Sequence, residues 1–215
     1  MHYIGIDLGT SAVKLLLVDE QGKIQNEVTK EYPLEFPKPG WSQQRPEDWK
    51  KAVFEGIPEL LSGFDAACVA GVGCGGQMHG LVVLDETDNV IRPAILWNDG
   101  RTAKQVDYLN HVIGREKLSA LTANIAFAGF TAPKLLWMKE NEPENFARIA
   151  KIMLPKDYIN YILTGVHGLY SKGDLAVFPM HLHNFLIIHT AVIKAHQRAS
   201  MPACVPFAIF VMAAA

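Results

Sequence analysis

Residues 2–20 read HYIGIDLGTSAVKLLLVDE, and this stretch contains two short apolar runs separated by a polar turn. The runs, at 2–7 and 13–18, have the length and composition of buried strands. The second run ends at DEQG (19–22), a sequence typical of turns, and a weakly alternating segment follows at 23–30. Because the connections are so short, we expect three strands that pair antiparallel as a meander.

The turn between the two runs has residue types that suit a bound phosphate. Gly9 allows backbone N–H groups to approach an anion closely, and Thr10 and Ser11 add hydroxyl donors. Lys14 adds a positive charge, and Asp7 is placed to hold a magnesium ion directly or through water. The alternative is an ordinary polar hairpin turn. It is not a Walker A loop, because that loop leads into a helix and this one leads into a strand.

The rest of the chain alternates between helical and extended patterns. Pro46 begins a predicted helix that runs to about Leu61, although Pro58 could end it early. We expect a proline-rich loop at 33–46, strands at 66–73, 80–85 and 152–154, and helices at 101–113, 115–121, 131–140, 144–150 and 155–163, the last capped by Gly165. This order of elements predicts an α/β domain with a mixed sheet.

Residues 71–76 (GVGCGG) match the G-x-G-x-x-G pattern of dinucleotide sites. Such a site requires a helix directly after the glycines, so that its N-terminus meets the pyrophosphate. Here Gln77, Met78, His79 and Gly80 follow, and then a further predicted strand. We therefore expect a strand that ends in a glycine-lined turn and presents Gln77, Met78 and His79 to a cleft. An ordinary loop histidine is the alternative for His79.

A third group of residues, Trp97, Asn98, Asp99 and Arg101, follows the apolar run 94–96. An aromatic face, an amide, a carboxylate and a guanidinium suit a polyhydroxylated ligand. Sugar hydroxyls need donors and acceptors, and sugar C–H faces pack on aromatic rings. The alternative is a turn in which Asn98 or Asp99 caps a helix that starts near Arg101.

Composition narrows the class of function. Apolar residues make up 49% of the 215 residues, enough to bury the core of one domain or slightly more. The charged fraction of 20% and the formal net charge of −2 indicate neither a nucleic-acid partner nor an acidic tail. Three scattered cysteines do not suggest a disulfide framework or a zinc site, which favours the reducing cytoplasm. The start of the chain, MHYIGIDLGT, lacks the basic region of a signal peptide.

Residues 168–215 differ in composition from residues 1–167. They contain a single acidic residue, Asp174, and are rich in apolar residues and histidine. From 175 to 195 the apolar stretch approaches the length of a membrane span, but a proline, histidines and a lysine interrupt it. We therefore expect no association with a membrane.

The chain resembles the FGGY family of carbohydrate kinases in three segments that occur in the family's order: IGIDLGTSAVKLLLVDE (4–20), GCGGQMHGLVVLD (73–85) and RPAILWNDGRT (92–102). Two later segments also look like helical stretches of the family: APKLLWMKENEP (132–143) and LPKDYINYILTG (154–165). Each motif is weak alone, but five in order over residues 1–167 make the resemblance specific.

The resemblance implies an actin-like, ribonuclease-H-like ATPase fold of two lobes, and this chain would be an incomplete N-terminal lobe with a mixed sheet. It implies ATP and Mg²⁺ as cofactors and a small-molecule sugar as partner, with no nucleic acid and no membrane, and a homodimer for full-length relatives. It assigns phosphate and magnesium binding to Asp7, Gly9, Thr10, Ser11 and Lys14, with Asp7 at the metal. It assigns the sugar site to Gln77, Met78, His79, Trp97, Asn98, Asp99 and Arg101.

Within the family, QMHG combined with LWNDGRT most resembles the members that phosphorylate D-xylulose. The implied reaction is ATP-dependent conversion of D-xylulose to D-xylulose 5-phosphate. Two alternatives stay open: a family member that acts on ribulose, gluconate or glycerol, and a non-catalytic remnant or sugar-binding fragment.

The resemblance ends near residue 167, before the glycine-rich turn that would carry the catalytic aspartate of the family. Asp174 lacks that context, so the catalytic role is not transferred to it. We therefore expect a partial kinase domain at 1–167, followed by an unmatched apolar tail at 168–215 that is frameshifted or disordered. As such a truncated form, the chain is expected to be inactive alone.

Overall fold

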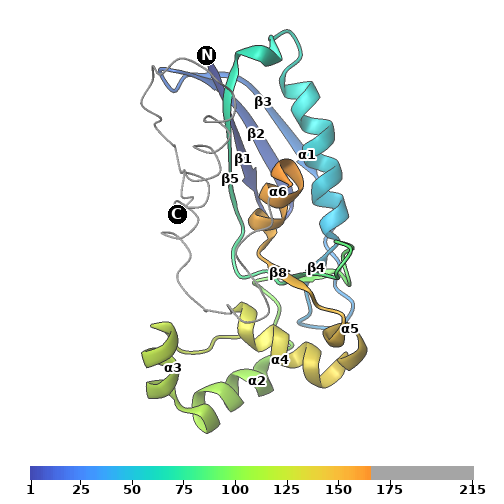
Figure 1. Ribbon diagram of the computed structural model, residues 1–215, viewed down its shortest axis with the longest axis vertical. Helices are drawn as coiled ribbons and strands as arrows, with labels where there is room; N and C mark the ends of the chain where they lie inside the picture. Colours follow the sequence, from blue (N-terminus) through green and yellow to red (C-terminus); the bar gives the residue numbers. More distant parts are fainter. Residues whose placement is uncertain (166–215) are drawn as a thin grey trace.

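A computed structural model describes residues 1–165, so the predictions made for 168–215 lie outside the described part. Within it, the central sheet contains β1 (His2–Leu8), β2 (Ala12–Asp19), β3 (Ile24–Glu31) and β5 (Val69–Gly76), in the order β3-β2-β1-β5. The first three strands pair antiparallel, and β5 lies parallel to β1 (Figure 1). The predicted meander and mixed sheet are confirmed.

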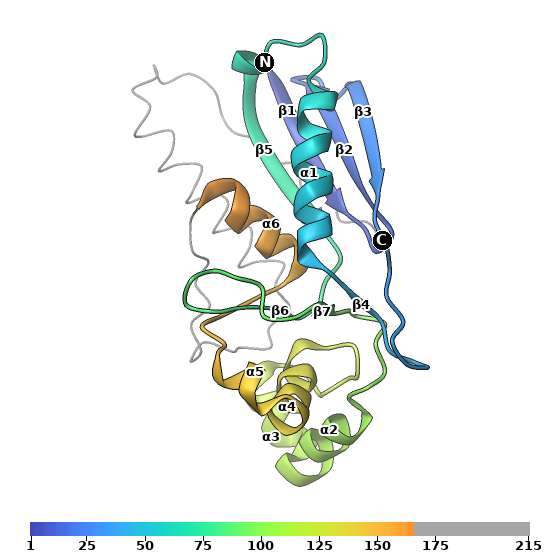
Figure 2. The same cartoon turned by 90° about the vertical axis from the view of Figure 1, so that its right-hand side faces the viewer.

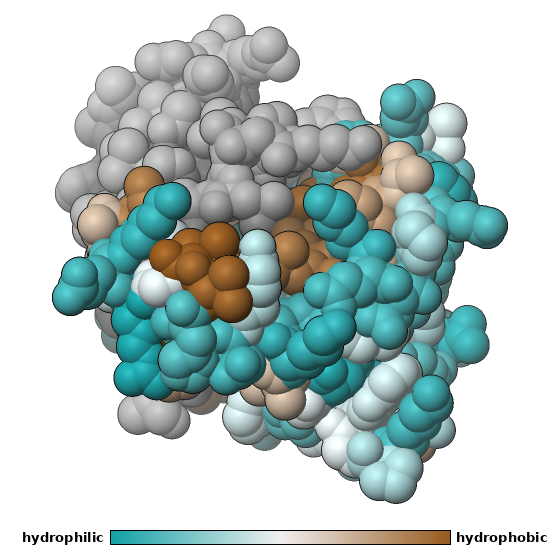
Figure 3. All heavy atoms as spheres, turned by 90° about the horizontal axis from the view of Figure 1, so that it is seen from below, coloured by the Kyte–Doolittle hydropathy of each residue, from teal (hydrophilic) through white to brown (hydrophobic). Residues whose placement is uncertain are grey.

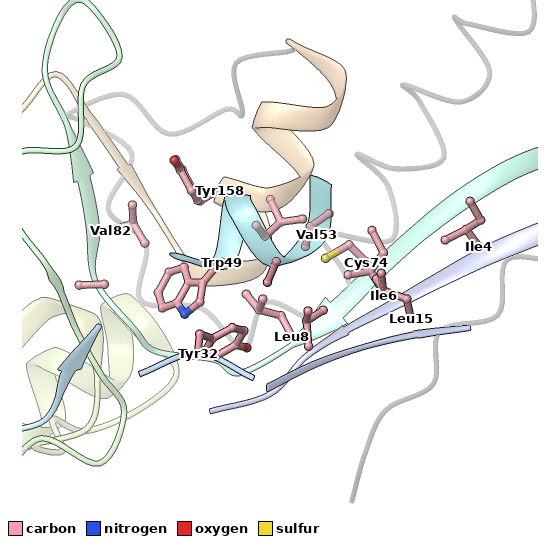
Figure 4. Packing of buried hydrophobic residues seen from close by; sticks show 14 of the residues in the cluster. Ile4, Ile6, Leu8, Leu15, Tyr32, Trp49, Val53, Cys74, Val82 and Tyr158 are labelled. Carbon is pink, nitrogen blue, oxygen red and sulfur yellow. The ribbon is translucent and has the colours of Figure 1, made fainter. Parts of the chain in front are cut away.

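One face of this sheet carries the main core. Ile4, Ile6 and Leu8 on β1 are buried, while Asp7 between them is exposed, as the two-residue period of a strand requires. Helices α1 (Pro46–Leu60) and α6 (Pro155–Thr164) both pack on the buried side (Figure 2). Figure 4 labels ten members of this core: Ile4, Ile6, Leu8, Leu15, Tyr32, Trp49, Val53, Cys74, Val82 and Tyr158.

The two covering helices start and end nearly where the sequence predicts. Each begins with a proline in its first turn, where the missing N–H would have no intrahelical acceptor. Pro58 lies inside α1 without ending it, because the N–H of Leu61 still bonds to the carbonyl of Ile57 in the last turn. Gly165, at φ +65°, caps α6 in the left-handed conformation, as predicted.

The strand after α1 differs from its prediction at both ends. Residues Ala66–Cys68 form a 3₁₀ turn, and β5 begins only at Val69. It then continues through the glycines to Gly76, so these residues belong to the strand rather than to a turn. Pairing with β1 along its whole length, from His2 to Leu8, outweighs the weak intrinsic strand preference of glycine.

Short strands join the sheet to a helical region. β4 (Gln43–Gln44) lies within the segment predicted as loop and pairs with β7 (Ala94–Ile95), while β6 (Val82–Leu84) pairs with β8 (Lys151–Met153). A second core packs beneath them; it consists of Leu81, Val83, Ile95, Leu135, Trp137, Met138 and Ile149. The strand predicted at 80–85 is thus confirmed in shortened form, and the one predicted at 152–154 is confirmed one residue earlier in the chain.

The helical region contains α2 (Ala103–Asp107), a π-helix (Tyr108–Gly114), α3 (Arg115–Thr122), α4 (Thr131–Asn141) and α5 (Pro143–Ala147). The helix predicted at 101–113 is therefore a short α-helix followed by a π-helix. Figure 3 views this end of the molecule, where hydrophilic side chains surround smaller hydrophobic patches. No helix among residues 1–165 is both long and apolar enough to cross a bilayer.

Candidate functional site

The turn between β1 and β2, residues 9–11, is held through its carbonyl groups. The Tyr32 hydroxyl donates to the Gly9 carbonyl over 2.6 Å, and Gln44 Nε2 donates to the Thr10 carbonyl over 2.7 Å. The Tyr32 N–H donates to the Ser11 carbonyl over 3.1 Å. In a planar trans peptide the N–H points opposite to the C=O. The N–H groups of Thr10 and Ser11 are therefore directed away from these donors, as an anion site needs.

The charged residues on either side of this turn lie on the open face of the sheet. Asp7 and Lys14 are both exposed and face each other in the β1–β2 register. Lys14 Nζ forms an ion pair with Glu27 over 3.1 Å. The hairpin geometry of the alternative interpretation is thus present, and beside the turn lie the Asp7 carboxylate and the Lys14 ammonium, the latter already paired with Glu27.

Two titratable groups of the main core, the Tyr32 hydroxyl and the Cys74 thiol, stay in their neutral forms. Burial, together with the nearby negative charge of Asp7, raises the pKa of the Tyr32 hydroxyl well above its usual range. Burial likewise raises the pKa of the Cys74 thiol to about 12, so that the thiol is protonated near neutral pH. Tyr32 therefore remains a hydrogen-bond donor to Gly9.

The segment after β5, residues 77–80, forms a second turn that contacts the first. The Gln77 N–H donates to the Leu8 carbonyl over 2.7 Å. Gln77 Nε2 lies 3.3 Å from both the Gly9 carbonyl and Gln44 Oε1. A strand, β6, follows this turn instead of a helix, which agrees with the rejection of a dinucleotide site. Gln77 thus connects the 77–80 turn to the 9–11 turn.

The other two residues predicted in this turn differ in accessibility, because Met78 is exposed whereas His79, like Gln77, is half-buried. Met78 is 37% exposed, and His79 has a positive φ of 60°, which is uncommon for a residue other than glycine. The His79 ring stacks on Phe130 with 4.4 Å between centroids and 19° between planes. Its carbonyl accepts a hydrogen bond from Lys134 Nζ over 2.6 Å. Contacts from a distant segment therefore hold the 77–80 turn in an unusual conformation.

Trp97 joins the same region from the end of β7. Its side chain is 49% exposed, and its Nε1 donates to Thr10 Oγ1 over 3.1 Å. Asn98 beside it is exposed. At Gly129 a Cβ would overlap the Trp97 carbonyl oxygen, so only glycine permits this close approach between the two segments.

Asp99 and Arg101 are placed differently from their neighbours. Both side chains are fully buried and form a bidentate pair, with Arg101 Nη2 and Nε at 2.7 and 2.8 Å from the carboxylate oxygens. Asp99 also accepts from the Ser42 N–H over 2.6 Å. The Arg101 guanidinium stacks on Trp41, with its Cζ 3.9 Å from the centroid of the ring. The pair therefore shapes the segment beneath Trp97 and Asn98 instead of facing solvent.

The alternative in which Asn98 or Asp99 caps a helix is wrong. The helix α2 begins at Ala103, two residues later than expected, and its N-cap position is Thr102. The Thr102 hydroxyl accepts no hydrogen bond from the helix, and its own proton is donated to the Ala128 carbonyl over 2.9 Å. The Asp99 carboxylate is occupied by Arg101 and Ser42, as described above.

Sequence reasoning missed three residues that organise the site: Tyr32, Gln44 and Lys134. Gln44 is completely buried, and its Oε1 accepts from Trp49 Nε1 over 3.1 Å while its amide nitrogen holds the 9–11 turn. A lysine in the apolar segment APKLLW is the one signal that sequence alone offered for Lys134. Tyr32 and Gln44 carried no comparable signal in a proline-rich stretch.

The donor set fits a phosphate group and, in part, a magnesium ion. Magnesium in phosphoryl-transfer sites is held by one or two carboxylates together with phosphate oxygens and water. Asp7 supplies one exposed carboxylate, and no cluster of three or more metal-ligating side chains occurs among residues 1–165. The residues present therefore suit a metal that arrives with phosphate more than a resident metal centre.

Comparison with known proteins gives a consistent result. The family model described as "FGGY family of carbohydrate kinases, N-terminal domain" matches residues 2–172. The xylulose kinase of Bacillus subtilis is 48% identical over 175 residues, which cover 80% of this chain and 35% of that protein. The chain thus spans about a third of the length of the curated relatives it matches.

Solved structures show the same fold. A crystal structure described as a "xyloylose kinase" from Brucella ovis superposes with a TM-score of 0.72 at 44% identity, covering 77% of this chain and 34% of that one. A gluconate kinase from Lactobacillus acidophilus also gives 0.72, at 31% identity, covering 77% of this chain and 34% of its own. The expected actin-like ATPase fold is therefore confirmed for the part of the chain that matches.

Proposed function

Because the chain belongs to the FGGY family of carbohydrate kinases, we propose that it provides the sugar and phosphate turns of an enzyme that phosphorylates D-xylulose with ATP. Relatives named xylulose kinase, at 41 to 48% identity, support the choice of sugar. The gluconate kinase match at 31% identity is weaker. D-Xylulose 5-phosphate would be the product.

One observation carries this proposal: three segments distant in sequence meet at the 9–11 turn. Gln77 Nε2 lies 3.3 Å from the Gly9 carbonyl, and Trp97 Nε1 lies 3.1 Å from Thr10 Oγ1. A kinase must hold the accepting hydroxyl close to the phosphate, because phosphoryl transfer depends mainly on positioning and charge neutralisation. A direct connection between a sugar-binding segment and a phosphate-binding turn meets this requirement.

The residues take distinct roles in this proposal. The N–H groups of Thr10 and Ser11 donate to phosphate oxygens, Lys14 adds positive charge, and Asp7 ligates magnesium. Bound ATP supplies the phosphoryl group. The sugar is held by the accessible side chains of the second and third segments, namely Met78, His79, Trp97 and Asn98. Asp99 and Arg101 support this site from below.

Binding measurements on the 215-residue chain test the proposal. Saturation-transfer NMR should show D-xylulose contacting the protein, with tighter binding than glycerol or D-gluconate. His79→Gln should weaken this binding, whereas His111→Gln, a change at an exposed histidine of the π-helix, should leave it unchanged. A folded chain that binds gluconate or glycerol better than D-xylulose would contradict the choice of sugar. Absence of any sugar binding would contradict the site.

A further inference from the structure

Lys134 is a fully buried lysine on α4, with 0% of its surface exposed. Burial of an ammonium group is costly unless hydrogen bonds replace the lost water. Two are present: Lys134 Nζ donates to the His79 carbonyl over 2.6 Å and to the Gly129 carbonyl over 2.7 Å. Two nearby charged side chains affect its pKa in opposite directions: Asp99 raises it, and Arg101 lowers it. The lysine therefore bridges the 77–80 turn and the segment before α4.

Both ends of this bridge are constrained. His79 adopts a φ of +60°, which costs free energy and persists only where surrounding contacts impose it. Phe130, on which the His79 ring stacks, lies one residue after Gly129. Thr131 Oγ1 adds a longer hydrogen bond of 3.3 Å to the same His79 carbonyl. The two stacked rings and the two carbonyls bonded to Lys134 thus come from the same two segments, the 77–80 turn and residues 129–130.

We propose that Lys134 is a positioning residue for the sugar site: by bridging the His79 and Gly129 carbonyls it fixes the stack of His79 on Phe130 as one wall of that site. The inference rests on the proposed function. A methionine or leucine would fill the same volume in the apolar interior, but neither could donate to the two carbonyls. The neutral amine also keeps two N–H donors, so the bridge does not depend on the charge.

The experiment uses the 215-residue chain and a readout that does not require sugar. The ring protons of His79 should resonate upfield in ¹H–¹³C NMR because they lie over the face of Phe130, and His79→Gln identifies their signals. Lys134→Met should move these signals toward the positions of unstacked histidine. It should also weaken D-xylulose binding about tenfold, because the affinity then includes the cost of ordering a wall that the bridge no longer fixes. Lys139→Met, an exposed change on the same helix, should alter neither property.

The outcomes separate this inference from the proposed function. If Lys134→Met loses the upfield shifts but the wild type binds no sugar, Lys134 does position the His79 ring. The proposed binding of D-xylulose would then be contradicted. Unchanged shifts and unchanged affinity in Lys134→Met would overturn the inference. Where Lys134→Met does not fold, Lys134→Gln is read in the same way, because its side chain is one bond shorter than that of lysine and cannot bridge both carbonyls. Failure of both variants to fold would also overturn it, because Lys134 would then serve the whole fold.

Discussion

Trp97 Nε1 donates a hydrogen bond to Thr10 Oγ1 over 3.1 Å, although the two residues are 87 positions apart in the chain. The bond joins the end of β7 to the turn between β1 and β2. Movement of Trp97 is thereby coupled to the 9–11 turn, where we propose that phosphate binds. The exposed indole face remains available for a ligand while its N–H holds the turn.

This coupling can be measured with a double-mutant cycle. Trp97→Phe removes the N–H donor but keeps an aromatic face, and Thr10→Val removes the acceptor. We expect a coupling free energy of about 0.5 to 1.5 kcal/mol in urea unfolding, the usual net value of one neutral hydrogen bond. Strictly additive effects of the two substitutions would show that the contact is not formed in solution.

Glycines in β5 should differ sharply in their tolerance of a side chain. Gly76 has a φ of +144°, and a Cβ there would overlap Leu8, so Gly76→Ala should lower the free energy of unfolding by about 2 to 4 kcal/mol. At Gly73 in the same strand, a Cβ would have no atom within 4 Å beyond those of its chain neighbours, so Gly73→Ala should change it by less than about 1 kcal/mol. Urea titrations compare the two variants. Equal effects would contradict the path of β5 described above.

The buried pair of Asp99 and Arg101 should be sensitive to a change that preserves charge. Lysine cannot reproduce the two parallel hydrogen bonds or the stacking on Trp41. Arg101→Lys should therefore cost about 3 kcal/mol or more, measured by chemical unfolding. The matched control is Arg148→Lys, because Arg148 forms a more exposed pair with Asp85 at 3.3 Å, and we expect a change within about 0.5 kcal/mol there. A small effect at Arg101 would argue that the pair is solvated.

Stability should depend on pH through Lys134. Burial lowers its pKa from the ordinary 10.5 to about 7 in the folded chain. Between these values the unfolded chain binds more protons than the folded chain, so the free energy of unfolding rises with pH, approaching about 1.4 kcal/mol per pH unit. Cys74, whose pKa is raised to about 12, acts in the opposite direction from about pH 9 upward.

The useful window for this measurement is therefore from pH 7 to about 8.5. Urea unfolding of the wild type should show the rise in this range, and Lys134→Met should lack it. The difference between the two proteins isolates the lysine from other titrating groups. A wild-type slope equal to that of the variant would mean that the folded chain keeps Lys134 charged throughout the range.

Much of the fold could be predicted because local signals and tertiary contacts agree. The first three strands alternate or concentrate apolar residues and are separated by short polar turns, which leaves few alternatives to a meander. Pro46 and Gly165 mark helix ends through properties of their own backbones. The path of β5 could not be predicted in this way, because its glycines favour a turn locally and become a strand only through pairing with β1.

The site could be predicted in part for a similar reason. Residues whose types suit ligand binding, such as Thr10, His79 and Trp97, are visible in short motifs of the sequence, and the structure brings their segments together. The residues that hold these motifs in place are not visible, because Gln44 and Lys134 act through backbone carbonyls of remote segments. Asp99 looks like a ligand-binding residue in the sequence, and only the fold reveals that Arg101 occupies it.

The four tryptophans of the chain sit in unequal surroundings. Trp49 and Trp137 are buried, with 0% and 8% of their surfaces exposed. Trp41 is half-buried and stacks on Arg101, whereas Trp97 is the exposed indole, beside the 9–11 turn. A soluble collisional quencher such as acrylamide therefore reaches Trp97 far more readily than the two buried indoles. The selectively quenched fraction of the ultraviolet emission is consequently expected to report ligand binding at the proposed site without any added label.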